Sequence, residues 1–421
     1  MALISKGATK SSLNRLNHAD FTSQAAGKCQ KTLTGYWAFL PNKLPPVLEV
    51  DWKLAGLLSE AASALAELSG TGRLLHNPHL LIRPYIRREA ILSSRIENTI
   101  AEMEELVLFE VEEERTPPAR SAVREVSNYV RAMDYGLKRI TELPVSKRLL
   151  CELHRILLAE VRGGESTKTP GEFRRSQNWI GRPGATLKDA TFVPPPPDEM
   201  LEALSDWERY LHDESSEPPL VKCAILHYQL EAIHPFIDGN GRIGRLLITL
   251  FLCAQECLSQ PLLYLSGFFD QDREAYYDRL LVVSQKGDWR SWIEYFLTGV
   301  RQQARSALRD TETVVGLYEQ YRSRLKKATR APVTAALILD ELFGNPVFSI
   351  SRFVKRTGNS FPTTNNGVQF WVKQGLLKET TGQRRHRLFV ARELLQLTAD
   401  KPPNAPITNL VTAHATPSPL E

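Results

Sequence analysis

Apolar side chains recur at helical spacing along most of the 421-residue chain. Residues 50–70, for example, place apolar side chains three and four positions apart and reach Gly70, a natural helix stop. A second predicted helix runs from Arg87 into the acidic residues 110–114, and Pro117 and Pro118 cannot continue it. We therefore expect a mainly α protein. The remaining predicted helices span residues 120–142, 146–163, 198–213, 219–233, 241–258, 272–286 and 289–325.

The composition is that of an ordinary globular protein, and the formal net charge of +5 does not make the whole chain a polyanion binder. The length allows two or three domains. The longest apolar run, residues 246–254, is too short to span a bilayer, and the first twelve residues lack the apolar region of a secretory signal. Five scattered cysteines are typical of reduced thiols, so we expect a cytoplasmic protein without membrane contact.

Residues 331–395 differ from the long helices before them, since their pattern of helices and short strands is typical of a winged helix-turn-helix. From Arg352 to Arg392 the chain carries nine Lys or Arg residues and one Glu. This charge suits DNA, through Arg384, Arg385 and Arg387 above all, but a wing can equally contact a protein. Both partners stay open. The predicted elements are helices at 332–343, 350–357 and 363–375 and strands at 376–380 and 387–390.

The residues HPFIDGNGRIGR at 234–245 lie between two predicted helices. Gly239 and Gly241 lack side chains, so the backbone can turn tightly and expose its N–H groups to an anion. The N-terminus of the following helix directs its unsatisfied N–H groups to the same place. Arg242 and Arg245 are three residues apart, hence on one helix face, and offer guanidinium groups to phosphate oxygens. This segment predicts a phosphate site at the start of a helix.

Two further side chains of this segment suit chemistry on a nucleotide. Asp238 is a hard oxygen ligand for Mg²⁺, which takes few carboxylates together with substrate phosphates. His234, whose ordinary pKa is near ~6.5, can accept a proton from an attacking hydroxyl. A plain Asp-Gly-Asn-Gly turn would explain the glycines alone. A metal site formed by His227, Glu231 and His234 on one helix would explain fewer of the residues.

The segment resembles the signature motif of Fic-domain proteins at every defining position. The resemblance implies a Fic-type helical core and the transfer of AMP from ATP to a Tyr, Thr or Ser hydroxyl of a target protein, a reaction called AMPylation. It implies that His234 is the catalytic base and that Asp238 holds Mg²⁺ beside the nucleotide. The remaining nucleotide contacts that it implies come from Gly239, Asn240, Gly241, Arg242, Ile243, Gly244 and Arg245.

Residues 171–195 resemble the small β-hairpin flap of the family. A target segment can pair with the edge of such a hairpin, which positions a hydroxyl without demanding a particular side chain. Without the downstream motif, the sequence indicates only a loop rich in Gly and Pro, with a connection at 182–190 that is long for a tight hairpin. The resemblance places Asn178, Trp179, Ile180 and Gly181 at the nucleotide.

Residues 93–98 (SSRIEN) resemble the family's inhibitory helix motif, with Ser93, Glu97 and Asn98 at its defining positions. The resemblance implies that Glu97 pairs with Arg245 and competes with the γ-phosphate, so that ATP binds with its α-phosphate out of line for attack. An exposed helix Glu is the ordinary alternative. The same carboxylate could also position a water molecule, which in some family members reverses the modification.

The resemblance covers about residues 40–390 and places Tyr276, Tyr277 and Gln285 at the adenine and ribose. A homodimer is a further expectation by resemblance. The expected organisation is an irregular lead-in (1–40), an N-terminal helical region with the inhibitory motif (41–118), a Fic catalytic core (119–328), a winged-helix-like domain (329–396) and a disordered tail (397–421).

Three other functions stay open from the sequence. The site could transfer another group, such as UMP or a phosphate, because phosphate contacts do not read the base. The enzyme could chiefly remove AMP. The chain could also be a DNA-binding regulator with the Fic core as its sensor, although a pure sensor would not need His234.

Overall fold

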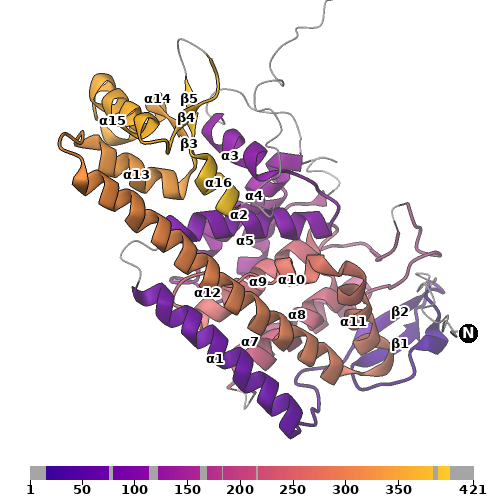
Figure 1. Ribbon diagram of the computed structural model, residues 1–421. Helices are drawn as coiled ribbons and strands as arrows, with labels where there is room; N and C mark the ends of the chain where they lie inside the picture. Colours follow the sequence, from indigo (N-terminus) through magenta and orange to yellow (C-terminus); the bar gives the residue numbers. More distant parts are fainter. Residues whose placement is uncertain are drawn as a thin grey trace, which may run out of the picture.

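The computed structural model describes residues 16–74, 79–112, 122–161, 168–182, 184–214, 217–382 and 387–398. The described chain is mainly helical, and residues 334–398 gather at one end of the molecule (Figure 1). Among these residues, no helix is both long and apolar enough to cross a membrane. Three parts of the expected organisation lie outside them: residues 1–15 of the lead-in, the tip of the wing with Arg384 and Arg385, and the tail from residue 399.

A β-hairpin opens the described chain, where we expected irregular structure up to residue 40. After a short 3₁₀ turn, η1 (His18–Asp20), strands β1 (Gly27–Lys31) and β2 (Trp37–Pro41) pair antiparallel, with Gly27 opposite Pro41. The expectation is wrong here because tertiary contacts hold the strands. Phe39 is fully buried, and its N–H donates to the carbonyl of Val193 over 2.8 Å.

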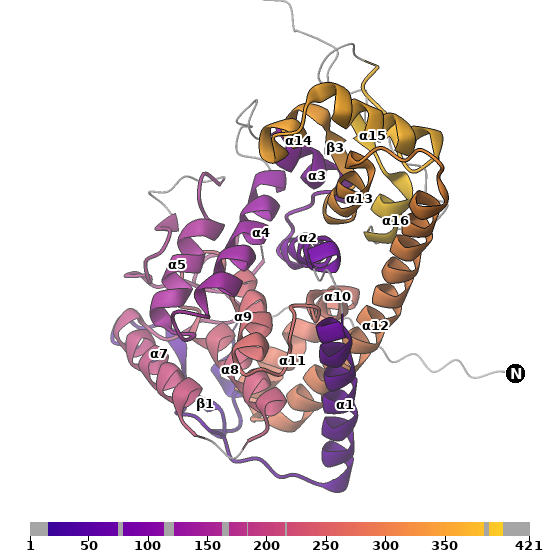
Figure 2. The same ribbon diagram turned by 90° about the vertical axis from the view of Figure 1, so that its left-hand side faces the viewer.

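Two long helices pack side by side. The first, α1 (Trp52–Leu74), runs past Gly70, where we expected it to stop, and lies along α12 (Trp289–Lys327) in both views (Figures 1 and 2). Glycine costs a helix only about 1 kcal/mol relative to alanine. Apolar packing against α12, by residues such as Leu65 and Leu68, offsets that cost.

The helix expected from Arg87 to residue 114 is two helices, α2 (His79–Ile96) and α3 (Met103–Glu112). Asn98 takes up a left-handed conformation with φ of 61°. The N–H of Asn98 then bonds the carbonyl of Arg95, and that of Thr99 bonds the carbonyl of Ser94. This Schellman-type end stops α2 and leaves Glu97 as its capping residue. In Figure 2, α2 is seen almost end-on at the middle of the molecule.

Helices α8 and α9 form the centre of the main hydrophobic core. Nearly every side chain of α8 is buried, and α9 packs against α8, α4 and α5. The short α10 was not expected, and α9 ends at residue 254 rather than 258. The elements are α4 (Ala122–Arg139), α5 (Lys147–Leu157), α7 (Pro197–His212), α8 (Pro219–Ile233), α9 (Asn240–Ala254), α10 (Ser266–Gln271) and α11 (Arg273–Lys286).

The C-terminal unit, residues 334–398, builds a second core around the buried Trp371. Its three expected helices are present, and a three-stranded antiparallel sheet of order β3-β5-β4 adds a strand, β3, that we did not expect. A final helix, α16, was also unexpected. The elements are α13 (Thr334–Gly344), β3 (Val347–Ser349), α14 (Ile350–Thr357), α15 (Phe361–Lys373), β4 (Lys378–Glu379), β5 (Leu388–Val390) and α16 (Arg392–Thr398).

Candidate functional site

Residues 234–239 form a tight loop that joins α8 to α9. Gly239 precedes α9 with φ of 81°, which glycine adopts at little cost. Asn240 fixes the loop, since its Oδ1 accepts from the N–H of Phe236 and its Nδ2 donates to the carbonyl of Phe236, both over 2.8 Å. Asn178 donates to the same carbonyl over 2.8 Å. We expected both asparagines at the nucleotide. Their side chains hold the loop, and their contact with a nucleotide stays a prediction.

His154, which the sequence did not single out, supports the loop from α5. Its buried ring stacks on Phe236 with centroids 3.9 Å apart. Nε2 donates to the carbonyl of Asp238 over 2.9 Å, while Nδ1 accepts from the N–H of Gly171 over 2.8 Å. This pair of bonds requires a neutral ring, and burial lowers the pKa of His154 to about 4. No local pattern marks this residue, because its partners lie far along the chain.

His234 has the protonation state that a general base requires. It caps α8 in a left-handed conformation with φ of 50°, and its carbonyl accepts from Nε of the buried Arg174 over 2.9 Å. Nδ1 lies 3.2 Å from the carbonyl of Glu231, which can only accept, so Nδ1 carries the proton and Nε2 holds the lone pair. Burial lowers the pKa of His234 to about 4. The ring is therefore neutral at neutral pH.

Asp238 and Arg242 belong to one network of charges. Oδ1 of Asp238 accepts from the N–H of Gly239 over 2.6 Å and lies 3.6 Å from the Arg242 guanidinium. Burial works against ionisation, but Arg242 and Lys168 hold the pKa of Asp238 below its usual range. Arg242 also pairs with Glu125 over 3.3 Å. The sequence indicated neither Lys168, whose Nζ lies 2.6 Å from Oδ2 of Asp238, nor Glu125.

The donors around Asp238 fit Mg²⁺ only in part. In the described chain, no group of three His, Cys, Asp or Glu side chains could hold a metal ion. A single carboxylate suits a Mg²⁺ ion that phosphates and water also coordinate. The alternative metal site at His227 has no support, because that ring bonds the carbonyl of Gly244 over 3.1 Å and the hydroxyl of Tyr276 over 2.9 Å.

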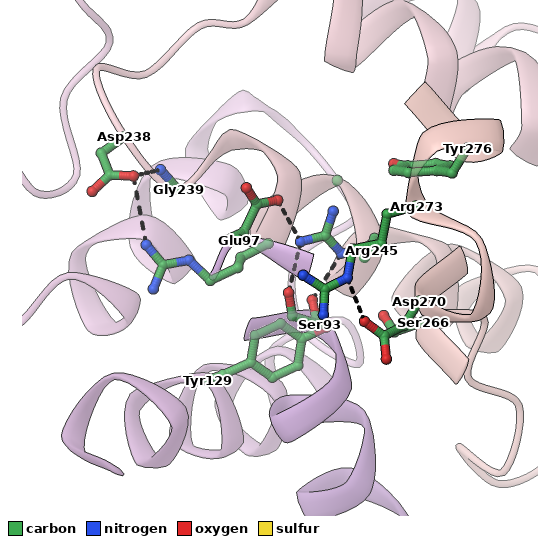
Figure 3. A network of polar contacts seen from close by, with 12 residues as sticks. Ser93, Glu97, Tyr129, Asp238, Gly239, Arg245, Ser266, Asp270, Arg273 and Tyr276 are labelled. Atoms are coloured by element: carbon green, nitrogen blue, oxygen red, sulfur yellow. Dashed lines mark hydrogen bonds and ion pairs between the residues drawn. The ribbon is translucent and has the colours of Figure 1, made fainter. Parts of the chain in front are cut away.

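Ser93 and Glu97 converge on Arg245 from the end of α2 (Figure 3). The Arg245 side chain is 1% exposed, and Nη2 donates to Oε1 of Glu97 over 2.7 Å and to the Ser93 carbonyl over 2.9 Å. Nε donates to the Ser93 hydroxyl over 2.9 Å, whereas the buried Nη1 has no partner. A carboxylate is disfavoured at a helix C-terminus, so Arg245 compensates for the position of Glu97. Asn98 contributes the turn that places Glu97 there.

The glycines of α9 make room for two carboxylates beside Arg245. A Cβ atom on Gly241 would lie 2.3 Å from Oε1 of Glu97, and one on Gly244 would lie 2.4 Å from Oε1 of Glu231. Burial raises the pKa of Glu231 to about 7. Ile243, which we expected at the nucleotide, buries its side chain in the core.

The expected flap is less regular than a hairpin. A single bridge joins Ile180 to Phe192, with the N–H of Ile180 2.9 Å from the Phe192 carbonyl. Trp179 is 40% exposed and donates its indole N–H to the carbonyl of Ala185 over 2.9 Å. Gly181 lies beside Ala185, since its Cβ would come within 3.0 Å of that of Ala185. The segment therefore has one short stretch of paired backbone rather than a regular two-stranded ladder of hydrogen bonds.

The three residues expected at adenine and ribose differ in their exposure. Tyr276 is fully buried and stacks on Phe269 with centroids 4.4 Å apart, so its ring is closed to a ligand. The carbonyl of Gln285 accepts from the N–H of Thr22 over 2.8 Å, which ties it to the N-terminal segment. Tyr277 is 40% exposed and is the only one of the three that offers a ring to solvent.

Residues 55–138 match the family model "Fic/DOC family N-terminal", and residues 144–252 match "Fic/DOC family". The chain is 29% identical over 233 residues to a protein adenylyltransferase Fic of Drosophila grimshawi, covering 51% of this chain and 44% of that protein. It is 34% identical over 175 residues to that of Drosophila ananassae, covering 40% and 31%. The chain thus spans less than half the length of these curated relatives.

One solved structure supports the fold. A Fic family protein from Desulfovibrio desulfuricans G20 superposes with a TM-score of 0.54 at 20% identity, covering 83% of this chain and 98% of that one. At this identity the likeness concerns the fold alone.

Proposed function

The chain belongs to the Fic/DOC family, and from this premise we propose that it transfers AMP from ATP to a side-chain hydroxyl of a target protein. The observation that carries the proposal is the neutral ring of His234, which lies in the loop just before the N-terminus of α9. The first two turns of α9 carry the buried Arg242 and Arg245. A base and an anion site therefore lie together. The name of the curated relatives, protein adenylyltransferase, supports the same reaction.

The reaction begins when the oxygen of a target Tyr, Thr or Ser hydroxyl attacks the α-phosphorus of ATP. The new O–P bond replaces the bond from the α-phosphorus to the bridging oxygen, so pyrophosphate leaves. Nε2 of His234 accepts the hydroxyl proton, which a neutral ring can do and a protonated ring cannot. The backbone beside the Ile180–Phe192 bridge would pair with an extended target segment, which would bring its hydroxyl toward this nitrogen.

The loop and α9 would receive the phosphates. The N–H of Gly239 is taken by Asp238, so Asn240 and Gly241 at the start of α9 would offer backbone N–H groups to the phosphates, together with the Arg242 guanidinium. Asp238 would hold Mg²⁺ together with phosphate oxygens, once Lys168 moves aside. A bound Mg²⁺ would neutralise charge on the phosphates. Tyr277 is the residue of the expected trio that could contact the adenine.

Autoinhibition is part of the proposal. Glu97 occupies one donor of Arg245, the guanidinium that would otherwise meet the γ-phosphate. With Glu97 in place, the triphosphate would bind in a different position, and its α-phosphorus would not align with the attacking oxygen. Because the Glu97 side chain is 34% exposed, it can leave without unfolding α2.

The test compares labels on different phosphates. We would incubate the Glu97→Gly variant and lysate protein with Mg²⁺ and ATP labelled at the α- or the γ-phosphate. AMP transfer labels protein from α-labelled ATP alone, and adding His234→Ala abolishes it, whereas His212→Ala on the exposed end of α7 does not. Label from γ-labelled ATP would indicate phosphate transfer instead of AMP transfer. Stronger label from α-labelled UTP than from α-labelled ATP would indicate UMP transfer. Release of label from a modified target by the wild type would show AMP removal.

The C-terminal unit has the order of helices and strands of a winged helix-turn-helix, and we assign it that architecture. Its basic side chains argue for contacts within the chain rather than for DNA. Arg352 donates to the carbonyl of Glu110, Arg356 pairs with Glu341, and Arg387 donates to Asn365. A salt-dependent gel shift that disappears on neutralising Arg384, Arg385 and Arg387 would restore the DNA-binding alternative.

A further inference from the structure

The C-terminal unit packs against α2, whose C-terminal end carries the inhibitory residues 93–98, and against α3, which follows them. One small hydrophobic cluster joins α3 to β3, β5 and α16. Since no side chain of this cluster belongs to the catalytic core, the cluster serves the junction itself. Its buried members are Met103, Val107, Val111, Val347, Leu388, Val390 and Leu395.

Arg87 is the polar centre of the same junction. This residue of α2 is 1% exposed, and it donates from Nη2 to Oε2 of Glu110 on α3 over 2.6 Å. Nη1 donates over 2.8 Å to the carbonyl of Gly344, the last residue of α13. Arg352 of α14 reaches the backbone carbonyl of Glu110 over 2.7 Å. One buried guanidinium thus ties α2 both to α3 and to the C-terminal unit.

Arg87 and Glu97 lie on the same uninterrupted stretch of α2 and its cap. Ten residues of α helix span about 15 Å, so a shift of the helix at Arg87 is carried to Glu97. Pro84, the proline inside α2, precedes Arg87 and therefore leaves this stretch straight. The contact at the far end is a 2.7 Å hydrogen bond to Arg245, which would be lost on a displacement of about 1 Å.

We propose that the C-terminal unit holds Glu97 against Arg245 through α2, with Arg87 as the positioning residue. The proposal rests on the autoinhibition described under the proposed function. A partner that loosens the C-terminal unit from α2 and α3 would then release the inhibition, although it binds far from the nucleotide. Coupling of this kind changes an equilibrium by roughly 5- to 150-fold in characterised proteins.

The experiment measures the transfer rate of Arg87→Ala in the wild-type and the Glu97→Gly backgrounds. We expect Arg87→Ala to raise the wild-type rate about 10-fold and to change the Glu97→Gly rate less than about 2-fold, because the contact it disturbs is already absent there. Arg87→Lys, which keeps the charge beside Glu110, should lie between. The matched control is Arg356→Ala, since Arg356 pairs with Glu341 inside the C-terminal unit.

Hydrogen exchange supplies a readout that does not depend on transfer. The amides of residues 93–98 should exchange faster in Arg87→Ala than in Arg356→Ala or wild type, with the amides of α8 unchanged as the sign of an intact fold. Equal rates of transfer and exchange in all three proteins would overturn the coupling, as would equal fold-changes in both backgrounds. If Glu97→Gly transfers nothing while exchange still responds to Arg87→Ala, the proposed function fails and the coupling stands.

Discussion

The loop at residues 234–240 and the inhibitory segment at residues 93–98 meet at α9, but they are held in place very differently. The loop is fixed by many buried contacts, both from within, where Asn240 closes it on Phe236, and from outside, by His154 and Asn178. The inhibitory segment depends on Arg245, which lies 148 residues from Glu97 along the chain. A loop held by several buried contacts keeps its geometry when one of them changes, whereas a single contact can be made and broken.

The two regions also differ in how deeply their key side chains are buried. Asn240 is 3% exposed, so its hydrogen bonds are shielded from water. The Glu97 side chain is 34% exposed, and its single hydrogen bond competes with solvent. We infer that the catalytic geometry is permanent and that the inhibition is adjustable. Each prediction below would break or sharpen this contrast.

The largest effect is expected from Asn240→Ala. It leaves the N–H of Phe236 without its side-chain acceptor and removes one of the two side-chain donors to the Phe236 carbonyl, and a loop displaced by about 1 Å can cost 100-fold in rate. We expect a loss of transfer of at least about 100-fold in the wild-type and the Glu97→Gly backgrounds alike. Asn240→Asp keeps the acceptor and should lose less. A loss confined to one background would mean that Asn240 acts through the inhibition.

Gly241→Ala should weaken the inhibitory contact from the other side. The new Cβ would lie 2.3 Å from Oε1 of Glu97 and 2.9 Å from Nη1 of Arg245, and the half-exposed Glu97 carboxylate is the group that must move away. We expect transfer to rise about 10-fold over wild type and to show little change in the Glu97→Gly background. The control is Gly316→Ala, where a Cβ meets nothing within 4 Å. A fall in both backgrounds would show that Gly241 serves the phosphates more than Glu97.

Lys168→Met should strengthen the binding of a divalent ion without nucleotide. The Lys168 ammonium lies 2.6 Å from Oδ2 of Asp238 and competes for that oxygen. Removing one such charge near a partly exposed site is worth ~1 kcal/mol, so the Kd for Mn²⁺ should fall about 5-fold by electron paramagnetic resonance. The exposed Lys188→Met is the control. An unchanged Kd would mean that Asp238 does not bind the ion.

The smallest effect concerns pH. Burial lowers the pKa of His227 to about 3, so between pH 6.5 and 3 the unfolded chain binds the proton that the folded chain refuses. The stability linked to His227 is therefore complete above pH 6.5 and falls as the pH drops, by about 2 kcal/mol at pH 5. Urea unfolding at pH 7 and 5 should show a smaller drop for His227→Gln than for wild type. Equal drops would exclude a neutral, buried His227.

The sequence predicts those parts of the site whose residues are contiguous in the chain. Helical spacing places Arg242 and Arg245 on one face, and Gly239 takes the backbone angle that its position requires. The pairing of Glu97 with Arg245 followed only from the family resemblance. No local pattern connects residues so far apart, and the turn at Asn98 that positions Glu97 became visible only with the structure.

The remaining differences arise because a sequence does not show which way a side chain faces. Asn240 and Asn178 suit a phosphate as well as a backbone carbonyl, and Tyr276 suits an adenine as well as a core. His154 and Lys168 had no signal, since their partner Asp238 is distant in sequence. These assignments are set by packing between helices rather than by spacing within one.

The central claim, that Glu97 restrains an AMP-transferring site whose base is His234, is tested most directly by intact mass spectrometry. Wild type, Glu97→Gly and Glu97→Gly with His234→Ala would each be incubated with ATP and Mg²⁺, and AMP adducts would be counted on the enzyme and on added lysate proteins. The account predicts many adducts with Glu97→Gly, few with wild type and none with the double variant. Equal modification by wild type and Glu97→Gly, or modification that survives the loss of His234, would contradict it.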